Sequence, residues 1–200
     1  MDRVSLGAER VFDEVQRIWR RRAGTVRVLD VACGSGDALV RVARRARKRG
    51  VDVALTGCDI SAVALDVAQR RAEGLEEIDF LKADALFGEL PEGYDLVCSS
   101  LFLHHLSGPQ AIGVLRRMAR ATRDTVLVQD LRRTRLGYVF AFVGLHLLTR
   151  SDVARTDGLV SVRASFTLGE ARELCASADL RGFEVAAAWP QRFTIRWTRP

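Results

Sequence analysis

The chain has 200 residues, of which 48% are hydrophobic, so it is long enough to form one domain with a buried core. Its formal net charge is +6 and its isoelectric point is about 9.8, yet Lys48 and Lys82 are its only lysines. The arginines cluster on predicted helices, where solvated helix faces explain them better than a nucleic-acid groove does. Composition therefore predicts a single domain, 1–200, and disfavours a nucleic-acid partner.

No apolar leader follows Met1, and the longest nearly apolar run, 136–148, is too short to span a bilayer. We therefore expect a cytoplasmic protein with no membrane span. The cysteines show no Cys-x-x-Cys spacing, so we expect reduced core side chains rather than metal ligands or disulfides. These cysteines are Cys33, Cys58, Cys98 and Cys175.

Taken in chain order, apolar runs that predict strands alternate with amphipathic runs that predict helices. Right-handed crossovers between such units give a mostly parallel sheet with helices on both faces. We predict an α/β fold with a Rossmann-like, doubly wound, seven-stranded sheet and a C-terminal antiparallel hairpin. The predicted strands are 26–31, 53–58, 77–81, 94–99, 125–130, 182–188 and 193–198, and the predicted helices are 12–22, 37–49, 62–71, 109–121, 136–148 and 168–178.

A glycine-rich turn, Cys33-Gly34-Ser35-Gly36, follows the first predicted strand and opens a helix. In a doubly wound fold this is the place where nucleotides bind. A dinucleotide motif would need a third glycine where the chain has Leu39, and no phosphate-binding P-loop is present. Acids here repel a pyrophosphate and suit an adenosine with a positively charged tail. These acids are Asp30, Asp37, Asp59 and Asp84.

In four motifs the chain resembles the class I S-adenosylmethionine-dependent methyltransferases. They are Leu29-Asp30-Val31-Ala32-Cys33-Gly34-Ser35-Gly36, Gly57-Cys58-Asp59-Ile60-Ser61, Ala83-Asp84-Ala85 and the run from Tyr94 to Leu106, which ends in Leu103-His104-His105-Leu106. The resemblance implies S-adenosyl-L-methionine as cofactor, S-adenosyl-L-homocysteine as its product and no metal. Ala32 departs from the family, which usually has glycine there, and we expect a slight loss of room without loss of the cofactor.

By the same resemblance, Gly34 and Gly36 pass close to the methionyl part of the cofactor, Asp59 holds the ribose, and Asp84 with Ala85 lines the adenine. The alternative for Asp59 and Asp84 is ordinary capping at strand ends. The full set of cofactor-binding residues that we expect is Asp30, Ala32, Cys33, Gly34, Ser35, Gly36, Asp59, Ile60, Asp84, Ala85, Ser99 and Ser100.

Two adjacent histidines, His104 and His105, follow the fourth predicted strand, close to where the methyl group should lie. Asp130 ends the neighbouring fifth strand and could orient an imidazole, as in a catalytic triad. We expect His104 to act as general base with Asp130, and His105 is the alternate because adjacent residues of a helix point in different directions. The competing interpretation gives the histidines capping and packing roles.

The predicted helix 136–148 is apolar nearly all round, so it must be buried, contact a partner or membrane surface, or cover a ligand. One interpretation is plain packing, and the other is a lid over a hydrophobic acceptor. The resulting organisation is 1–24 as an N-terminal cap helix, 25–130 as the cofactor-binding core, 131–166 as the apolar insertion and 167–200 as a C-terminal helix and hairpin. The expected acceptor-binding residues are Phe12, Trp19, Tyr138, Phe142 and His146.

The sequence thus favours an enzyme that methylates a small hydrophobic acceptor, aromatic or polyketide-like, and most simply on oxygen. Two alternatives stay open: an RNA or protein methyltransferase that uses the arginine faces, and a non-catalytic cofactor-binding subunit. A nicotinamide oxidoreductase is disfavoured by Leu39 and by the acids around the turn. The sequence does not reveal an oligomeric state.

Overall fold

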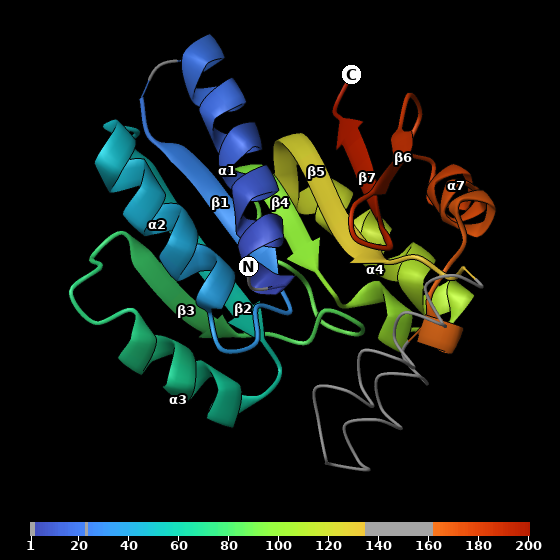
Figure 1. Cartoon of the computed structure of the whole chain (residues 1–200), viewed down its shortest axis with the longest axis horizontal. Coiled ribbons are helices and arrows are strands. Elements are labelled where there is room, and N and C mark those ends of the chain that lie inside the picture. Colours follow the sequence, from blue (N-terminus) through green and yellow to red (C-terminus); the bar gives the residue numbers. More distant parts are fainter. Residues whose placement is uncertain (1–2, 23, 135–161) are drawn as a thin grey trace.

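The computed structural model of the chain describes residues 3–22, 24–134 and 162–200 (Figure 1). In this part of the chain a seven-stranded sheet has the order β3-β2-β1-β4-β5-β7-β6. The strands are β1 (Val26–Val31), β2 (Val53–Asp59), β3 (Ile78–Lys82), β4 (Tyr94–Ser100), β5 (Thr122–Leu131), β6 (Glu184–Ala188) and β7 (Arg192–Thr198). The helices are α1 (Arg3–Arg22), α2 (Asp37–Arg49), α3 (Ala62–Arg71), the short 3₁₀ helix η1 (Leu103–His105), α4 (Gly108–Ala121) and α7 (Leu168–Ser177).

The five strands β1 to β5 are mutually parallel, and β7 is antiparallel to both β5 and β6. This confirms the predicted α/β class, the doubly wound parallel sheet and the C-terminal hairpin. The hairpin enters the sheet by its second strand, since β7 lies between β5 and β6. All parallel strands therefore end at one carboxyl edge, and β7 begins there because Arg192 pairs with Leu131, the last residue of β5.

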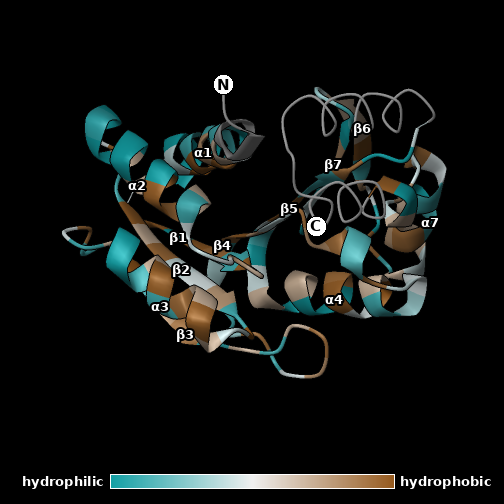
Figure 2. Cartoon of the chain, turned by 60° about the horizontal axis from the view of Figure 1, so that its bottom comes forward, coloured by the Kyte–Doolittle hydropathy of each residue, from teal (hydrophilic) through white to brown (hydrophobic). Residues whose placement is uncertain are grey.

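Helices cover both faces of the sheet (Figures 1 and 2). On one face, Phe12 and Ile18 of α1 share a buried cluster with Leu39 of α2. On the other face, residues of α4 and α7 pack with Phe193 and Ile195 of β7. Burying such apolar side chains on each face supplies the main stabilisation, at roughly 1.5–3 kcal/mol for each large side chain.

Helix α1 begins at Arg3, nine residues before the start that the sequence predicted. The added turns carry Ala8 and Val11, which continue the buried spacing of Val15 and Ile18 at intervals of three and four residues. Gly7 weakens the local helix signal, but packing on the sheet outweighs this weakness. A Cβ placed on Gly7 would lie 3.6 Å from the Ser100 Oγ atom, so the first turns of α1 lie over the carboxyl edge.

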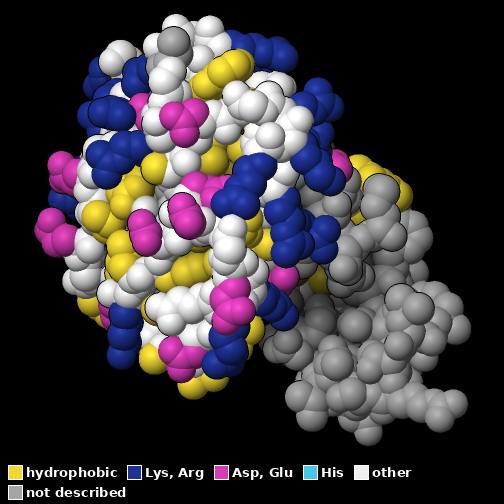
Figure 3. All heavy atoms as spheres, turned by 90° about the vertical axis from the view of Figure 1, so that its left-hand side faces the viewer, with side chains coloured by type: hydrophobic (Ala, Val, Ile, Leu, Met, Phe, Trp, Pro, Cys, Tyr) yellow, Lys and Arg dark blue, Asp and Glu magenta, His cyan; other side chains and the backbone are white. Residues whose placement is uncertain are grey.

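Strand β3 is an edge of the sheet, and Figure 3 shows this side of the molecule, with acidic and basic side chains around hydrophobic ones. Asp79 and Lys82 of β3 are exposed. Charged side chains on an edge strand oppose pairing with another chain. Among the described helices, none is long and apolar enough to cross a membrane. The predicted helix 136–148 lies outside the described residues.

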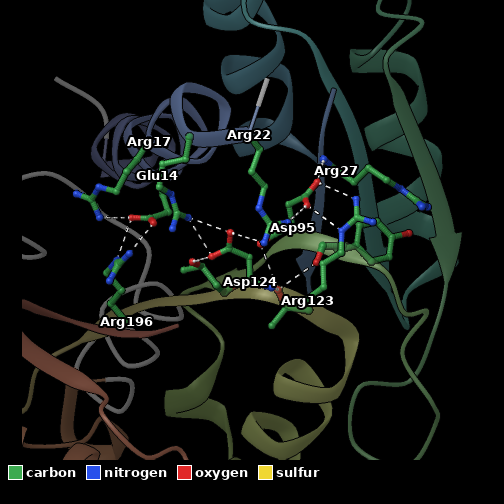
Figure 4. A network of polar contacts seen from close by, with 12 residues as sticks. Glu14, Arg17, Arg22, Arg27, Asp95, Arg123, Asp124 and Arg196 are labelled. Carbon is green, nitrogen blue, oxygen red and sulfur yellow. Dashed lines mark hydrogen bonds and ion pairs between the residues drawn. The ribbon is translucent and has the colours of Figure 1, made fainter. Parts of the chain in front are cut away.

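A network of ion pairs joins α1 to the sheet (Figure 4). The Glu14 carboxylate of α1 is only 4% exposed. It accepts hydrogen bonds from Arg17, one turn further along α1, at 2.7 Å and from Arg196 of β7 at 3.0 Å. This pairing fixes the middle of α1 against β7, because a buried carboxylate without its partners would be costly.

The same network continues at the amino ends of β4 and β5, where Asp95 and Asp124 are both buried. Asp124 pairs with Arg21 at 2.9 Å and with Arg22 at 3.3 Å. Asp95 pairs with Arg22 at 3.1 Å and with Arg123 at 2.9 Å. Arg21, Arg22 and Arg123 therefore neutralise buried carboxylates, whereas the sequence analysis interpreted the arginines as parts of solvated helix faces. Their long side chains reach acids that are remote in the sequence.

The network makes stability sensitive to acid through Asp95. Burial acts to raise the pKa of Asp95, but hydrogen bonds from Arg123 and from the Arg27 N–H hold it below its ordinary value. The stabilisation by this carboxylate is thus complete above the unfolded pKa, near 4, and is lost as the pH falls through the lower folded value. We expect Asp95→Asn to reduce the free energy of unfolding by about 1–3 kcal/mol at pH 7. Urea unfolding at several pH values measures this loss.

A matched control for this variant is Asp179→Asn, since Asp179 is 85% exposed in its ion pair with Arg116. Exposed pairs contribute little, so the control should unfold like the wild type. Equal losses in the two variants would contradict the network's role.

Candidate functional site

The site is built on the turn between β1 and α2. Ala32, Gly34 and Gly36 have φ angles of 57°, 54° and 73°, all in the left-handed region. The turn is closed by the Gly36 N–H, which donates to the Cys33 carbonyl at 3.0 Å, and the Cys33 N–H connects it to β2 by donating to the Cys58 carbonyl at 3.0 Å. A left-handed conformation is natural for glycine and strained for alanine. Ala32 therefore keeps the backbone shape that a glycine would give, at an energetic cost.

Close packing beneath the turn explains why residue 57 of β2 is a glycine. A Cβ on Gly57 of β2 would lie 2.8 Å from the Cys33 Sγ atom and 2.9 Å from a methyl carbon of Leu39. Real Cβ atoms do not approach other atoms so closely, so Gly57 is required for the turn to rest on β2. The turn is thus held at a fixed height above the sheet edge.

Asp59 links the turn to the loop that follows β2. Its Oδ2 atom accepts the Gly34 N–H at 2.9 Å, and its Oδ1 atom accepts the Ser61 N–H at 2.9 Å. Ser61 in turn caps α3, because its hydroxyl accepts the Ala64 N–H at 3.2 Å. The carboxylate that the sequence analysis expected to hold the ribose is therefore also a structural tie between two loops.

The residues expected at the adenine lie along the neighbouring edge. The Ala83 N–H donates to the Asp59 carbonyl at 3.1 Å, which places the loop after β3 beside the end of β2. Asp84 Oδ1 accepts the Leu86 N–H at 2.8 Å, so this carboxylate shapes its own loop. Ala85 is 8% exposed, whereas Ile60 is 59% exposed. Ile60 thus offers an apolar surface next to the Asp59 carboxylate.

Asp30 is the buried acid of the site, with 4% of its surface exposed. The Cys98 thiol donates to its Oδ1 atom at a sulfur–oxygen distance of 3.7 Å. Burial raises the pKa of Asp30 from 3.8 to about 7, the bond from Cys98 opposes this rise, and the charge of Asp59 adds to it. Asp30 therefore has an unfavourable negative charge at neutral pH, which a bound cation would stabilise.

The neighbouring thiols are unreactive. Burial raises the pKa of the Cys58 thiol to about 12, and it also raises the pKa values of Cys33 and Cys98 well above the ordinary value. A thiol that stays protonated is a poor nucleophile and a poor metal ligand. Within the described residues, no three His, Cys, Asp or Glu side chains are grouped as a metal site.

Asp37, the acid inside the turn, has partners of its own. The Ser35 hydroxyl donates to Asp37 at 3.0 Å, and the Arg71 guanidinium of α3 forms an ion pair with the same carboxylate. Arg71 also donates to the Ser35 hydroxyl at 2.7 Å. The charge of Asp37 is thus largely neutralised, and Asp30 is the acid of the turn whose charge is least compensated.

A cavity of about 280 Å³ opens between the turn and the first turns of α1. Ser100 lines it, whereas Ser99 is 1% exposed and donates to the Val31 carbonyl at 2.8 Å, so the contact of Ser99 with the cofactor stays a prediction. Four further wall residues were not among the site residues expected from the sequence: Gly7, Ala38, Leu101 and Arg192. The wall consists of Gly7, Asp30, Ala32, Cys33, Gly34, Ser35, Asp37, Ala38, Ser100, Leu101 and Arg192.

Beyond this cavity the structure brings His104 and Asp130 together. His104 Nδ1 lies 2.6 Å from Asp130 Oδ1, and the His104 N–H donates to Asp130 Oδ2 at 3.2 Å. Asp130 is fully buried and His104 is 7% exposed. His105 is exposed, with its ring centroid 4.0 Å from that of His104. Of the two adjacent histidines, His104 is thus the one that Asp130 orients.

The expected acceptor residues are placed differently. Phe12 is 2% exposed in the core between α1 and α2, and Trp19 is partly buried against the same cluster. The apolar stripe of α1 is thus used for packing on the sheet, and a role of these two side chains at the acceptor stays a prediction. The remaining three, Tyr138, Phe142 and His146, lie outside the described residues.

A parallel sheet with a glycine turn and acids at its carboxyl edge defines a nucleotide-binding fold of the doubly wound class. Residues 28–125 match the family described as methyltransferase domain. This stretch, just under half of the chain, is therefore a methyltransferase domain, and it contains the four motifs in which the sequence resembles the class I S-adenosylmethionine-dependent methyltransferases.

Known relatives agree with this family. The chain is 30% identical over 129 residues to a ubiquinone biosynthesis O-methyltransferase of Pseudomonas fluorescens, an alignment that covers 62% of the chain and 52% of the relative. It is 42% identical over 84 residues to an uncharacterized methyltransferase of Mycobacterium tuberculosis, covering 42% of the chain and 39% of the relative. The chain thus spans about half or less of these two curated relatives.

Among solved structures, the fold matches magnesium protoporphyrin IX methyltransferase from Synechocystis PCC 6803, solved with bound S-adenosylhomocysteine. The TM-score is 0.66 at 17% identity, and the match covers 98% of this chain and 85% of that one. At this identity the likeness establishes the fold.

The strain at Ala32 predicts that Ala32→Gly stabilises the protein. Replacing an alanine in the left-handed conformation removes a strain of about 1–2 kcal/mol from the folded state. The greater conformational freedom of glycine in the unfolded chain lowers the free energy of unfolding by about 0.4–1 kcal/mol. Chemical denaturation should therefore show an increase of up to about 1.6 kcal/mol in the free energy of unfolding. The control is Ala64→Gly inside helix α3, which should lose about 0.5–1 kcal/mol. A loss in both variants would contradict the strain.

The buried charge of Asp30 predicts a second stabilising variant. The pKa of Asp30 in the folded protein, about 7, lies above the ordinary 3.8. The folded state therefore has its full stability below pH 4, where Asp30 is protonated in both states. That stability is lost as the pH rises through 7, because the folded protein must then hold a buried charge. Asp30→Asn keeps the size and removes the charge. We expect it to be more stable than the wild type at pH 8 and equal to it near pH 4, measured by urea unfolding. Asp79→Asn on the exposed edge is the control, and a destabilised Asp30→Asn at pH 8 would refute the charge argument.

Proposed function

We propose that the protein transfers a methyl group from S-adenosylmethionine to an oxygen atom of a small hydrophobic acceptor, aromatic or polyketide-like. The observation that carries this proposal is the buried pair of His104 and Asp130, 2.6 Å apart at the carboxyl ends of β4 and β5. Leu101, three residues before His104, lines the cavity at the glycine turn. The proposed general base is therefore only three residues away from a residue of the cavity wall.

The residues at the sheet edge fit the cofactor. A cavity of about 280 Å³ next to the glycine turn has the size of part of a nucleotide ligand, and its buried acid favours a positive charge. We assign the methionyl part to the turn at Gly34, the ribose to Asp59, and the adenine to Asp84, Ala85 and Ile60. When bound, S-adenosylmethionine supplies a methyl group that its sulfonium already activates.

The part of Asp130 is to fix the ring of His104. Its Oδ1 atom accepts a hydrogen bond from Nδ1–H in the tautomer that leaves Nε2 with a lone pair. Nε2 would then take the proton of an acceptor hydroxyl, so that the O–H bond breaks and its electron pair stays on the acceptor oxygen. That oxygen would form its bond to the methyl carbon as the carbon–sulfur bond of the sulfonium breaks and leaves its electron pair on sulfur. The carboxylate of Asp130 stabilises the resulting imidazolium. General-base help of this kind contributes about 10²–10⁴-fold.

The names of related proteins support a small acceptor, since they include a ubiquinone biosynthesis O-methyltransferase and a magnesium protoporphyrin IX methyltransferase. The arginine faces give little support to an RNA or protein acceptor, because Arg21, Arg22 and Arg123 pair with buried acids. A cytoplasmic location and the lid over the acceptor stay predictions.

The test is turnover on a panel of phenols and polyketide-like hydroxyl compounds, followed as S-adenosylhomocysteine formed. We expect His104→Ala to lower kcat by about 10²–10⁴-fold, with cofactor affinity measured by calorimetry unchanged. His105→Ala is the matched control and should retain turnover within a few-fold.

Other results would revise or end this assignment. If His105→Ala abolishes turnover and His104→Ala does not, the base is His105. If neither variant matters, transfer depends on proximity alone. Purified protein that binds neither S-adenosylmethionine nor S-adenosylhomocysteine would end the proposal.

A further inference from the structure

Strand β6 forms the second edge of the sheet, at the opposite end from β3 (Figure 1). In the described part of the chain it pairs only with β7, so its outer side presents backbone N–H and C=O groups to which another strand can bind. The two edges differ in their side chains. Asp79 and Lys82 place charges on β3, whereas β6 has the sequence Glu-Val-Ala-Ala-Ala with one charge, that of Glu184. The charges that oppose pairing are thus nearly missing from β6.

The outer side of β6 is accessible from outside the sheet. Glu184, Ala186 and Ala187 are exposed. The Val185 carbonyl accepts a hydrogen bond from the exposed side chain of Arg172 on α7, at the long distance of 3.4 Å. A backbone N–H of a further strand would make a shorter and stronger bond. Strand β6 is therefore open to the addition of a strand.

The residues around β6 can pair with a second copy of themselves. In an antiparallel pair centred on Ala186, each residue lies opposite the partner's residue that is equally far from Ala186 in the other direction. Glu184 then lies opposite the partner's Ala188. One residue beyond each end of the strand, Phe183 lies opposite the partner's Trp189. The whole of β6 is thus paired, with an aromatic contact at each end.

Trp189 is an exposed aromatic side chain that this pairing would cover. It is 72% exposed, whereas Phe183 is partly buried against the apolar cluster under α7. Aromatic side chains on facing strands attract one another, and the two-fold symmetry forms this contact twice. A centre one residue earlier would place Trp189 opposite the partner's Arg181, and a centre one residue later would place it opposite the partner's Val185. The centre at Ala186 therefore pairs the two aromatic residues.

The charges beside the edge also suit a second copy. In a two-fold dimer a surface meets itself, so a patch of one sign would repel its partner. Arg172 and Glu173 are adjacent exposed residues of α7 with opposite charges. Arg181 and Glu184, near the start of β6, are also exposed and opposite in charge. The surface next to β6 is thus balanced in charge and can complement itself.

We propose that the chain forms a two-fold dimer in which β6 pairs antiparallel with the partner's β6 around Ala186. The sheets of the two copies then join into one continuous sheet. A single strand is a small interface beside the roughly 800 Å² per partner of a standard one, so we expect a dimer that forms at micromolar concentration. The proposal is independent of methyl transfer, since residues 183–189 are absent from the cavity wall.

The first experiment traps the register with a disulfide in the full chain. In Ala186→Cys the two new thiols face each other across the axis, at the Cα separation of about 4.4–6.8 Å that a disulfide needs. In Ala187→Cys, the matched control, the two thiols lie two residues out of register and more than about 7 Å apart. We expect mild oxidation to give a covalent dimer of Ala186→Cys on non-reducing gels, and to leave Ala187→Cys and the wild type monomeric there.

The second experiment tests the aromatic contact without an added cysteine. Trp189→Ala should raise the dimer Kd, measured by sedimentation equilibrium, by about 10–100-fold, because the contact with Phe183 is lost twice. The matched control is Phe87→Ala in the loop after β3, which removes another exposed aromatic ring, 80% exposed, and should leave the Kd unchanged. Circular dichroism checks that both variants are folded.

Three results would overturn the proposal. The wild type would sediment as a monomer throughout the micromolar range. Ala186→Cys and Ala187→Cys would be trapped equally, which shows random collision instead of one register. The Kd would be the same in Trp189→Ala and in the wild type, which shows that the copies associate through another surface.

Discussion

The carboxylate of Asp59 holds together the two loops on which the site depends. One oxygen fixes the Gly34 N–H after β1, and the other fixes the Ser61 N–H at the start of α3. An ionised carboxylate has about four acceptor positions, so two backbone bonds leave room for hydroxyl donors. Capping and ribose binding, which the sequence presented as alternatives for this residue, are therefore compatible.

The remaining walls of the site come from segments far away in the chain. Helix α1 is fixed to β7 through Glu14 and Arg196 and to β5 through Gln129 and Gly7. These contacts place the first turns of α1 over the carboxyl edge, where Gly7 lines the cavity. The acids on β1 and β2 are thus only one half of the site, and the other half is supplied by the long-range contacts of α1 and β7.

Sequence patterns were sufficient to predict the strands and the residues that follow their carboxyl ends. Apolar runs and glycine turns predicted the sheet, and strand-end positions brought His104 and Asp130 to neighbouring strands, where they lie 2.6 Å apart. Contacts between remote segments left no such signal. Phe12 has the same apolar pattern whether it faces a ligand or the core, and it is 2% exposed in the core. Arg192 resembles any loop arginine until the register of β7 with β5 places it in the cavity wall.

The position of β7 between β5 and β6 has a consequence for biosynthesis. One hydrogen-bonding edge of β5 stays unpaired until β7 is synthesised, roughly 60 residues later. At the usual pace of translation, about 5–20 residues per second, that edge stays open for roughly 3–12 s. An unpaired strand edge is a template on which another chain can form hydrogen bonds, which leads to aggregation. The recovery of folded protein from cells should therefore depend on chaperones that cover β5 during this interval.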